Sequence, residues 1–424
     1  MKSLGIEPIE HWNNPLVGLP VAVPPPVDSP GGGQLALFHR IVPKGLQRLQ
    51  LSKPARHPIP SEVLEHYARC GRPTPLVRAR QLERHLGTPA RIYLKREDLL
   101  PSGSFKLNTA LAQVAQARKE GFEGVVSETG AGQWGLSLAM ASAIHGLSCR
   151  VFQARCSYEQ KPLRHGLMGL HGAAVVPSPS ELTASGRRMA ESEKLRAGSI
   201  GTAISEAVEF ARDNTGYAYT AGSNLVYVYA HQTVIGLETI RQLQALSERP
   251  DVVVACVGGG SNFAGFALPL AYGSDAFVER PRLLACESAV VPRLTQGRYQ
   301  YDHGDPLQLT PLTKSYSLGS DFVPPPTHVG GLRQHNGSAL IGALHAAGLI
   351  EVSAWDEPEV FAAGRLLARL EGMVAAPESC HALCGVIAEA RAAAALGVER
   401  VIVSCVSGSG ALDWNGYQKH AGAS

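Results

Sequence analysis

The sequence lacks long hydrophobic runs and any strong excess of one charge. No stretch of about 18 apolar residues occurs in the 424-residue chain, and MKSLGIEPIEHWNN, its first segment, has no apolar core like that of a signal peptide. Lysine and arginine number 39 against 36 acidic residues, so the formal net charge is only +3. We therefore expect a cytoplasmic protein with neither nucleic-acid nor membrane partners.

The eight cysteines show neither disulfide-scaffold nor metal-site spacing. Several lie inside apolar runs, as Cys256 does in VVVACV (252–257), which is typical of buried thiols in a reducing compartment. Cys380 and Cys384 would share a helix face, but a structural zinc site needs two further ligands, and none stands nearby. The sequence therefore predicts no metal site.

Two stretches lack regular periodicity. PLVGLPVAVPPPVDSPGGG (15–33) is rich in proline and glycine, so residues 1–70 are predicted to form an extended wrap or a loose arm. Residues 300–337 are long for a structureless loop and are expected to shape a site or a subunit interface. We expect scattered His145, His165 and His171 at the surface, and a solvated helix face at 187–196.

From about Thr74 onward, short apolar runs alternate with helical stretches rich in alanine and leucine. This alternation predicts an α/β protein with parallel sheets and helices on both faces. The expected strands are RIYLK (91–95), EGVVS (123–127), CRVFQAR (149–155), AAVVP (173–177), DVVVACV (251–257), RLLACE (282–287) and RVIVSCV (400–406). The clearest expected helices are 104–119, 136–145 and 379–396.

Glycine-rich turns fall where a strand should end and a helix begin, which is where ligands bind in open α/β sheets. PSGSFKLNT (101–109) places Lys106 just inside a helix, although a lysine there is by itself most often a solvated side chain. SETGAGQWG (127–135) would present backbone N–H groups that suit a carboxylate. Glu128 in this turn is hard to explain structurally, because it ends a buried strand.

The third turn, VGGGSN (257–262), lets the backbone close on a phosphate. It is not the dinucleotide fingerprint, because Phe263 stands where that motif has its last small residue, and it is not a P-loop, because it lacks the Lys-Ser/Thr pair. A fourth turn, SCVSGSG (404–410), follows the last strand and could hold a hydroxyl at the sheet edge.

Together these turns resemble, in order, the fold type II pyridoxal-phosphate enzymes, and among them the tryptophan synthase β chain of the longer, N-terminally extended type. The likeness runs from about Ile41 to the end. It is carried by GRPTPL (71–76), YLKREDLLPSGSFKLNTA (93–110), ETGAGQWG (128–135), SYEQKP (157–162), GTAISEAVEF (201–210), HQTVIGLE (231–238), GGGSN (258–262), DFVPPPTHVGGLR (321–333), EGMVAAPESCHA (371–382) and SGSG (407–410).

The resemblance implies two three-layer αβα domains with the site between them. A larger domain would comprise 71–105 and 226–424, and a smaller one 106–225 with a mobile subdomain at about 121–208. It also implies a homodimer and leaves an α-type partner subunit open. The implied cofactor is pyridoxal 5'-phosphate, with a monovalent cation as a further candidate.

The resemblance further implies the roles of individual residues. Lys106 would carry the cofactor and then move protons, and Glu128 would be the acid/base. Other implied cofactor contacts are Asn108, Gly258, Gly259, Gly260, Ser261, Asn262, Glu371 beside the ring and Ser407 at the pyridine nitrogen. Implied substrate contacts are Thr129, Gly130, Ala131, Gly132, Gln133, Trp134 and Asp305, although Trp134 is also typical of a residue that packs a helix start.

The implied reaction is a lyase-type β-replacement: L-serine loses water to give an enzyme-bound aminoacrylate, to which indole or a similar nucleophile adds. One departure weakens this prediction, since the family has His before the lysine and this chain has Phe105. The alternatives are a related β-replacement or β-elimination enzyme with threonine or another nucleophile, and a non-catalytic scaffold subunit. Retention of Lys106, Glu128, GGGSN and Ser407 together argues against the scaffold.

Overall fold

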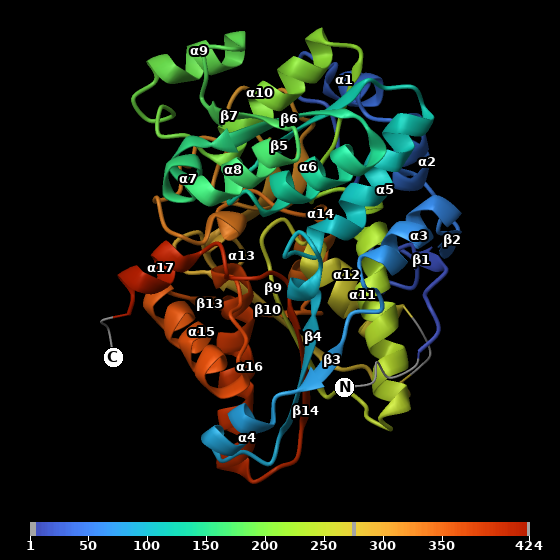
Figure 1. Cartoon of the computed structure of the whole chain (residues 1–424), viewed down its shortest axis with the longest axis vertical. Coiled ribbons are helices and arrows are strands. Elements are labelled where there is room, and N and C mark those ends of the chain that lie inside the picture. Colours follow the sequence, from blue (N-terminus) through green and yellow to red (C-terminus); the bar gives the residue numbers. More distant parts are fainter. Residues whose placement is uncertain (1–5, 274–276, 422–424) are drawn as a thin grey trace.

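Two mostly parallel sheets occupy the lower and upper halves of the molecule (Figure 1). The computed structural model describes residues 6–273 and 277–421. The larger sheet has the order β13-β10-β9-β14-β4-β3, with β3 (Leu76–Arg78), β4 (Arg91–Arg96), β9 (Val252–Cys256), β10 (Arg282–Ser288), β13 (Glu351–Trp355) and β14 (Val401–Val406). The smaller sheet has the order β7-β6-β5-β8, with β5 (Gly124–Thr129), β6 (Ser148–Ala154), β7 (Ala174–Ser178) and β8 (Tyr217–Tyr219). Among the neighbouring strands of these two sheets, within the described residues, only β3 and β4 run antiparallel to each other.

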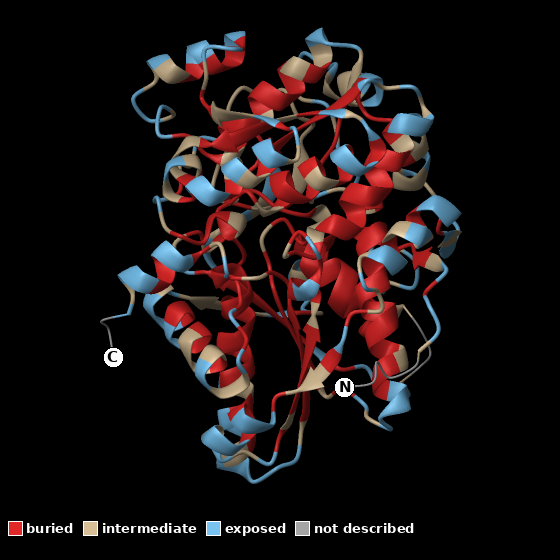
Figure 2. Ribbon diagram, viewed as in Figure 1, coloured by how far each residue is buried: buried red, intermediate tan, exposed pale blue. Residues whose placement is uncertain are grey.

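Alternate side chains of each central strand enter separate hydrophobic cores. In β9, Val253 and Ala255 pack in one core. Val252 and Val254 pack in another on the opposite face. Because both sets are apolar, the sheet must be covered on both faces, as parallel sheets are. Figure 2 shows the central strands of both sheets as buried and the outward sides of the covering helices as exposed, whereas the edge strands β3, β7 and β13 are mostly intermediate.

Helices supply that cover on each face, and the resulting layers confirm the predicted α/β fold. One face of the larger sheet packs against α4 (Arg80–Leu86), α15 (Glu357–Glu371) and α16 (Pro377–Leu396), and the other against α11 (Val226–Ala245) and α12 (Ser261–Tyr272). The smaller sheet lies between α5 (Lys106–Lys119), α6 (Gln133–His145) and α8 (Pro162–Leu170) on one side and α10 (Ile200–Asp213) with α1 (Gln34–Ile41) on the other. Shorter helices are α7 (Arg155–Gln160), α9 (Ala184–Glu191), α13 (Arg293–Gln296), α14 (Ala339–Ala346), α17 (Trp414–Lys419) and the 3-10 turns η1 (Glu97–Leu99) and η2 (Gly330–Leu332).

Local sequence signals set several helix ends. α15 begins after Asp356, whose carboxylate accepts from the backbone of Glu359 while the Glu359 side chain accepts from Asp356 in return. The helix ends before Gly372, which has φ of 68° and can adopt that left-handed conformation without strain. Short-range capping therefore places α15 independently of the rest of the fold.

The N-terminal residues form a packed wrap and not a loose arm. They contain α1, α2 (Lys44–Gln50), α3 (Ser61–Arg69) and a hairpin of β1 (His11–Asn13) with β2 (Arg56–Pro58). Trp12 is buried in the main core, and the backbone N–H of Asn13 donates to Thr233 Oγ1 at 2.9 Å. The prediction extended the irregular character of 15–33 to the whole of 1–70, whereas the three helices follow that stretch. Helices this short gain their stability by packing on the body of the protein.

Residues 300–337 are more regular than their sequence indicates. β11 (Arg298–Asp302) and β12 (Thr313–Ser317) form an antiparallel hairpin, and η2 follows. Gly331, Leu332 and Gln334 line the cavity described below, as expected for a segment that shapes a site.

The predicted exposure of three histidines and the predicted exposure of residues 187–196 have different outcomes. His145 is buried, which corrects the prediction that it lies at the surface, whereas His165 and His171 are half-buried. The prediction failed for His145 because α3 of the N-terminal wrap covers the end of α6. In the stretch 187–196 the helix ends at Glu191, and the charged side chains are exposed as predicted.

The predicted domain boundaries at 70, 105 and 225 stay a prediction, as does the mobile subdomain. Strand order shows which segments share a sheet, whereas a boundary is a statement about independent folding or motion. In the described ranges, none of the helices is both long and apolar enough to cross a membrane.

Candidate active site

One cavity collects the ends of several parallel strands. Its walls come from the turns after β5, β8, β9 and β14, together with the first residues of α5 and α6. Because these strands are parallel within each sheet, their carboxyl ends lie at one edge, where α/β proteins bind ligands. Lys106, Glu128 and Ser407, which lie far apart in the sequence, all line this cavity.

Lys106 is the first residue of α5, and its side chain points into the cavity. Nζ donates to Ser261 Oγ at 2.7 Å and to the carbonyl oxygen of Gly222. Burial lowers the pKa of Lys106 to about 7, while Cys256 and Glu128 oppose the shift. A substantial fraction of this amine is therefore neutral at pH 7, and a neutral amine can attack a carbonyl carbon.

Glu128 is buried near the end of β5. Burial raises the pKa of its carboxyl to about 7, against the lowering effect of hydrogen bonds, including one from the Tyr219 hydroxyl at 2.8 Å. A carboxyl with this pKa can both donate and accept a proton near neutral pH. Two groups with opposite charge types and similar pKa values thus share one cavity.

The turn between β5 and α6 forms a second wall. Thr129, Gly130, Ala131, Gln133 and Trp134 line the cavity. Trp134 also packs its ring on Gly222 and donates its indole N–H to Ser127 Oγ at 2.8 Å, so its role in packing is clear. The open N–H groups at the start of α6 suit an anionic group.

Gly132 belongs to this turn but not to the cavity lining. It precedes α6 with φ of 93°, in the left-handed region that glycine adopts freely. Its contribution is therefore to shape the turn.

The glycine turn after β9 forms a third wall and leads into α12. A Cβ at Gly258 would collide with the carbonyl oxygen of Gly331, so the two backbones approach too closely for any other residue. Gly260 has φ of 92° and directly precedes α12. Backbone N–H groups of such a turn at a helix start can hold a phosphate.

Several buried polar atoms of the lining have no hydrogen-bond partner among the described residues. They are Gln133 Nε2, Ser223 Oγ, Asn262 Oδ1 and Glu378 Oε2. Buried polar atoms are almost always satisfied, so this concentration at one cavity indicates a polar ligand. An amine, a phosphate-binding turn and unsatisfied polar groups together fit a phosphorylated aldehyde cofactor.

Comparison with known proteins supports the same conclusion. The sequence pattern of the family described as "Pyridoxal-phosphate dependent enzyme" matches residues 68–408. "Tryptophan synthase beta chain 2" of Thermotoga maritima is 46% identical over 411 residues, which cover 96% of this chain and 97% of that protein. This chain belongs to the tryptophan synthase β-chain family.

Other β-chain relatives are equally similar over their length. "Tryptophan synthase beta chain 2" of Methanothermobacter thermautotrophicus is 46% identical over 96% of this chain and 95% of that protein.

Among solved structures, maize serine racemase superposes with a TM-score of 0.58 at 18% identity, covering 85% of this chain and 98% of the racemase. The racemase shares the fold, which confirms the predicted fold type II architecture.

Within this β-chain fold, Glu371 is not at the cavity, which corrects its predicted place beside the cofactor. It is the last residue of α15, and its carboxylate accepts from the backbone N–H groups of Gln81 and Leu82, both at 2.8 Å. Glu378, in the first turn of α16, lines the cavity instead. The segment EGMVAAPESCHA contains both glutamates, and only the three-dimensional path of the chain distinguishes them.

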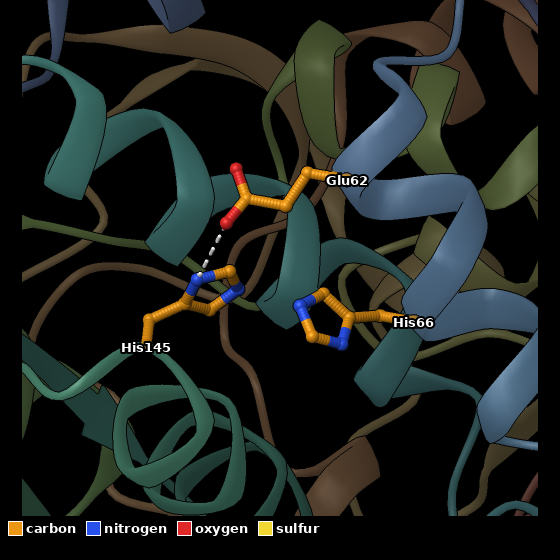
Figure 3. A group of neighbouring side chains, drawn as sticks. All are labelled: Glu62, His66 and His145. Carbon is orange, nitrogen blue, oxygen red and sulfur yellow. Dashed lines mark ion pairs between the residues drawn. The ribbon is translucent and has the colours of Figure 1, made fainter.

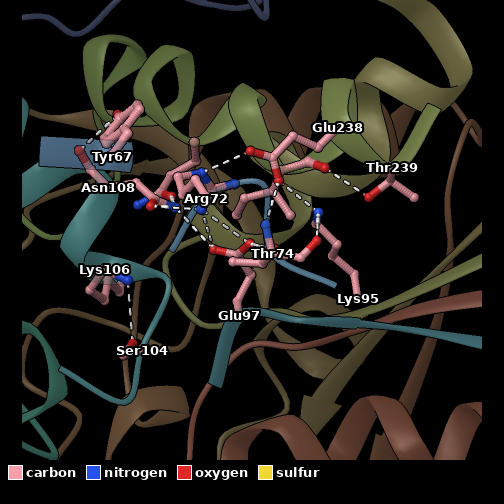
Figure 4. Close-up of polar contacts among 12 residues, drawn as sticks. Tyr67, Arg72, Thr74, Lys95, Glu97, Ser104, Lys106, Asn108, Glu238 and Thr239 are labelled. Atoms are coloured by element: carbon pink, nitrogen blue, oxygen red, sulfur yellow. Dashed lines mark hydrogen bonds and ion pairs between the residues drawn. The ribbon is translucent and has the colours of Figure 1, made fainter. Parts of the chain in front are cut away.

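Asn108 also lies outside the cavity lining. It accepts from Arg72 at 2.9 Å and donates to Glu97 at 3.1 Å, within a buried charge network that includes Glu238 and Lys95 (Figure 4). Because Asn108 is one half-turn from Lys106 on α5, this network fixes the helix that presents the lysine. The contact of Asn108 with a cofactor stays a prediction, and Asn108 is not among the residues that line the cavity.

Asp305 is fully buried away from the cavity lining. Its carboxylate accepts from Ser205 Oγ at 2.6 Å and from the backbone of Thr310 at 2.9 Å. In this structure it joins the hairpin segment to α10, so the predicted substrate contact is not observed.

The sequence argument missed several cavity residues, among them Ser223, Asn224, Cys256, Glu378, Ile200 and Ile204. Tyr219 was also missed, although it donates to Glu128. Ser379 lies behind Ser407, with 2.7 Å between their hydroxyl oxygens. The segment AGSN (221–224) after β8 was the one available signal, since it resembles the end of GGGSN (258–262) and is also a small-residue turn at a strand end.

Proposed function

We propose that this protein forms L-tryptophan from L-serine and indole by replacing the serine hydroxyl. Curated β-chain relatives over nearly the whole chain support the reaction, and the cavity supports it chemically. The single observation that carries the proposal is that a buried amine and a buried carboxyl, each with a pKa of about 7, share the cavity.

The residues fit pyridoxal phosphate, which supplies an electron-withdrawing ring that acidifies the Cα–H bond of a bound amino acid. Lys106 would hold the aldehyde and move the Cα proton. The Gly258–Asn262 turn would hold the phosphate through backbone N–H groups, and Ser407 would face the ring nitrogen. A hydroxyl there does not protonate the ring as a carboxylic acid would.

The remaining residues would bind and orient the substrates. The turn 129–133 would hold the serine carboxylate, and Glu128 would donate a proton to the departing hydroxyl. Ile200, Ile204 and Leu332 give the cavity an apolar portion that suits indole. The predicted closing of residues 121–208 would exclude water from the reacting groups.

A second candidate reaction follows from Phe105. Its buried ring lies 4.8 Å from Lys106 Nζ, where the family has a histidine. An apolar ring in this position changes the contacts available to the donor amino acid, which favours testing L-threonine as donor and other nucleophiles in place of indole.

Product analysis tests both candidates. The protein loaded with pyridoxal phosphate is incubated with L-serine or L-threonine, with and without indole, and products are identified by mass. We expect L-tryptophan from serine plus indole, and none with the Lys106→Ala variant. Pyruvate alone in the presence of indole would exclude the synthase reaction.

Assembly and ion requirements stay predictions from the family resemblance. A homodimer is expected, an α-type partner is left open, and a monovalent cation is a candidate activator. The eight cysteines, all free thiols, are compatible with the expected reducing compartment.

A further inference from the structure

A cluster of three potential metal ligands lies outside the cavity, between α3 and α6. Glu62 and His66 belong to α3, and His145 is the last residue of α6. One ligand atom from each side chain lies within 4.8 Å of the other two (Figure 3). Helix packing brings these residues together, because α3 and α6 both pack against α5.

The spacing on α3 suits a shared ion. Glu62 and His66 are four residues apart, so they lie on the same face of the helix one turn from each other. Two ligands at this spacing can approach one metal ion from the same side. His145 approaches from the other helix, and its ring lies edge-on to His66 with 4.9 Å between the ring centroids.

His145 is the decisive residue because it is buried and one of its ring nitrogens has no partner. Its side chain is 1% exposed, and Nε2 has no hydrogen-bond partner among the described residues. Nδ1 has only Glu62 Oε1 beside it, at 3.3 Å. A neutral imidazole carries a lone pair on one ring nitrogen, and a metal ion can bind there.

We propose that Glu62, His66 and His145 bind a divalent transition-metal ion with the preferences of Zn²⁺. Two imidazoles and one carboxylate leave a fourth position for water, a ligand set that zinc accepts readily. The ion would satisfy the buried imidazole nitrogen, which otherwise lacks a partner. This proposal does not depend on the reaction proposed above.

The geometry requires only small movements. Bonds of about 2.1 Å in a tetrahedral site place ligand atoms about 3.4 Å apart, so the three atoms must approach one another. Glu62 is half-exposed and can move by changing its rotamer. Arg118, whose guanidinium lies 3.8 Å from Glu62, has a side chain that is 57% exposed and can turn into solvent.

Such a site would join α3 of the N-terminal wrap to α6, one of the helices that cover the smaller sheet. α3 lies in the wrap, whereas α6 begins at the cavity with Gln133 and ends at His145. A metal ion would therefore hold the far end of the helix whose first turn lines the cavity. We expect this bridge to raise thermal stability without contributing a group to the reaction.

Zinc titration of the holoenzyme, prepared without a histidine tag and treated with EDTA, tests the site. Calorimetry should give one Zn²⁺ per chain, and Co²⁺ should give the visible absorption of a tetrahedral site. We expect His66→Ala and Glu62→Gln each to weaken Zn²⁺ binding by about tenfold or more. Both variants replace accessible side chains, so they should fold even if a His145 variant does not.

His39→Ala is the matched control, because His39 is exposed on α1 away from the cluster. Zn²⁺ should raise the melting temperature of the parent protein and this control, but not of the two ligand variants. Absence of stoichiometric Zn²⁺ binding would overturn the proposal. Equal binding by the parent and both ligand variants would also overturn it, since the ion would then occupy another site.

Discussion

At the scale of single residues, the behaviour of Lys106 depends on its surroundings. Burial lowers its pKa to about 7, so the neutral fraction of the amine rises as pH increases through 7. Capture of pyridoxal phosphate by the cofactor-free protein needs the neutral amine. We therefore expect the capture rate to fall about tenfold for each pH unit below 7 and to level off above about pH 8.

Stopped-flow absorbance of the cofactor, recorded across this pH range, measures the rate directly. Glu128→Gln removes the negative charge that raises the lysine pKa, so the midpoint should move to lower pH. A midpoint near the ordinary lysine value of about 10.4 would contradict the effect of burial.

Glu371 and Glu378 form a second residue-scale test. Glu378→Gln alters a buried group of the cavity lining, and we expect a loss of activity of about tenfold or more with little change in folding. Glu371→Ala removes the acceptor for two backbone N–H groups at the start of α4, which should lower the free energy of unfolding by about 1 kcal/mol.

Steady-state kinetics and urea unfolding of both variants separate the two roles. An inactive but stable Glu371→Ala protein would support the predicted contact between Glu371 and the cofactor.

At the scale of elements, the close approach of two turns limits what position 258 accepts. A methyl group at Gly258 would collide with the Gly331 carbonyl, so Gly258→Ala must displace the turn after β9 or η2. Overpacking usually costs about 1–3 kcal/mol, and here the displaced turn is the one that would hold the phosphate, so we expect the affinity for pyridoxal phosphate to fall by about tenfold.

Gly166→Ala is the control, because Gly166 lies in α8 with open space around its Cα. It should leave cofactor affinity unchanged and stabilise the helix by about 0.5–1 kcal/mol. Fluorescence titration with the cofactor distinguishes the variants. Equal affinities would show that the turn after β9 accommodates the added methyl group without weakening cofactor binding.

At the scale of the whole molecule, a buried charge network joins segments that are distant in sequence. Glu238 of α11 accepts from Arg72 at 3.0 Å and from Lys95 of β4 at 2.7 Å, and all three side chains are at most 3% exposed. Glu238→Gln leaves the buried Lys95 without its carboxylate partner, while Arg72 keeps Glu97 at 2.9 Å, so we expect a loss of about 3 kcal/mol in unfolding free energy.

Asp321→Asn provides the comparison, since its partner Lys194 and Asp321 itself are both more than half exposed. That change should alter stability by no more than about 0.5 kcal/mol. Urea denaturation of both variants measures the difference, and equal small effects would show that the network contributes little.

The sequence by itself determined the alternating α/β architecture, because strand and helix periodicities are local. It also predicted that Lys106, Glu128, the triple-glycine turn and Ser407 would lie together, since each stands at or after the end of an apolar strand and the carboxyl ends of parallel strands converge. Those residues all line one cavity.

Only the tertiary structure showed that Glu378, and not Glu371, lines the cavity. It also showed that His145 is buried and that residues 6–70 form a packed wrap. These features depend on contacts between segments far apart in the chain. Side-chain types and local spacing carry no information about which distant element will lie against them, whereas a strand or a turn is encoded by its own neighbours.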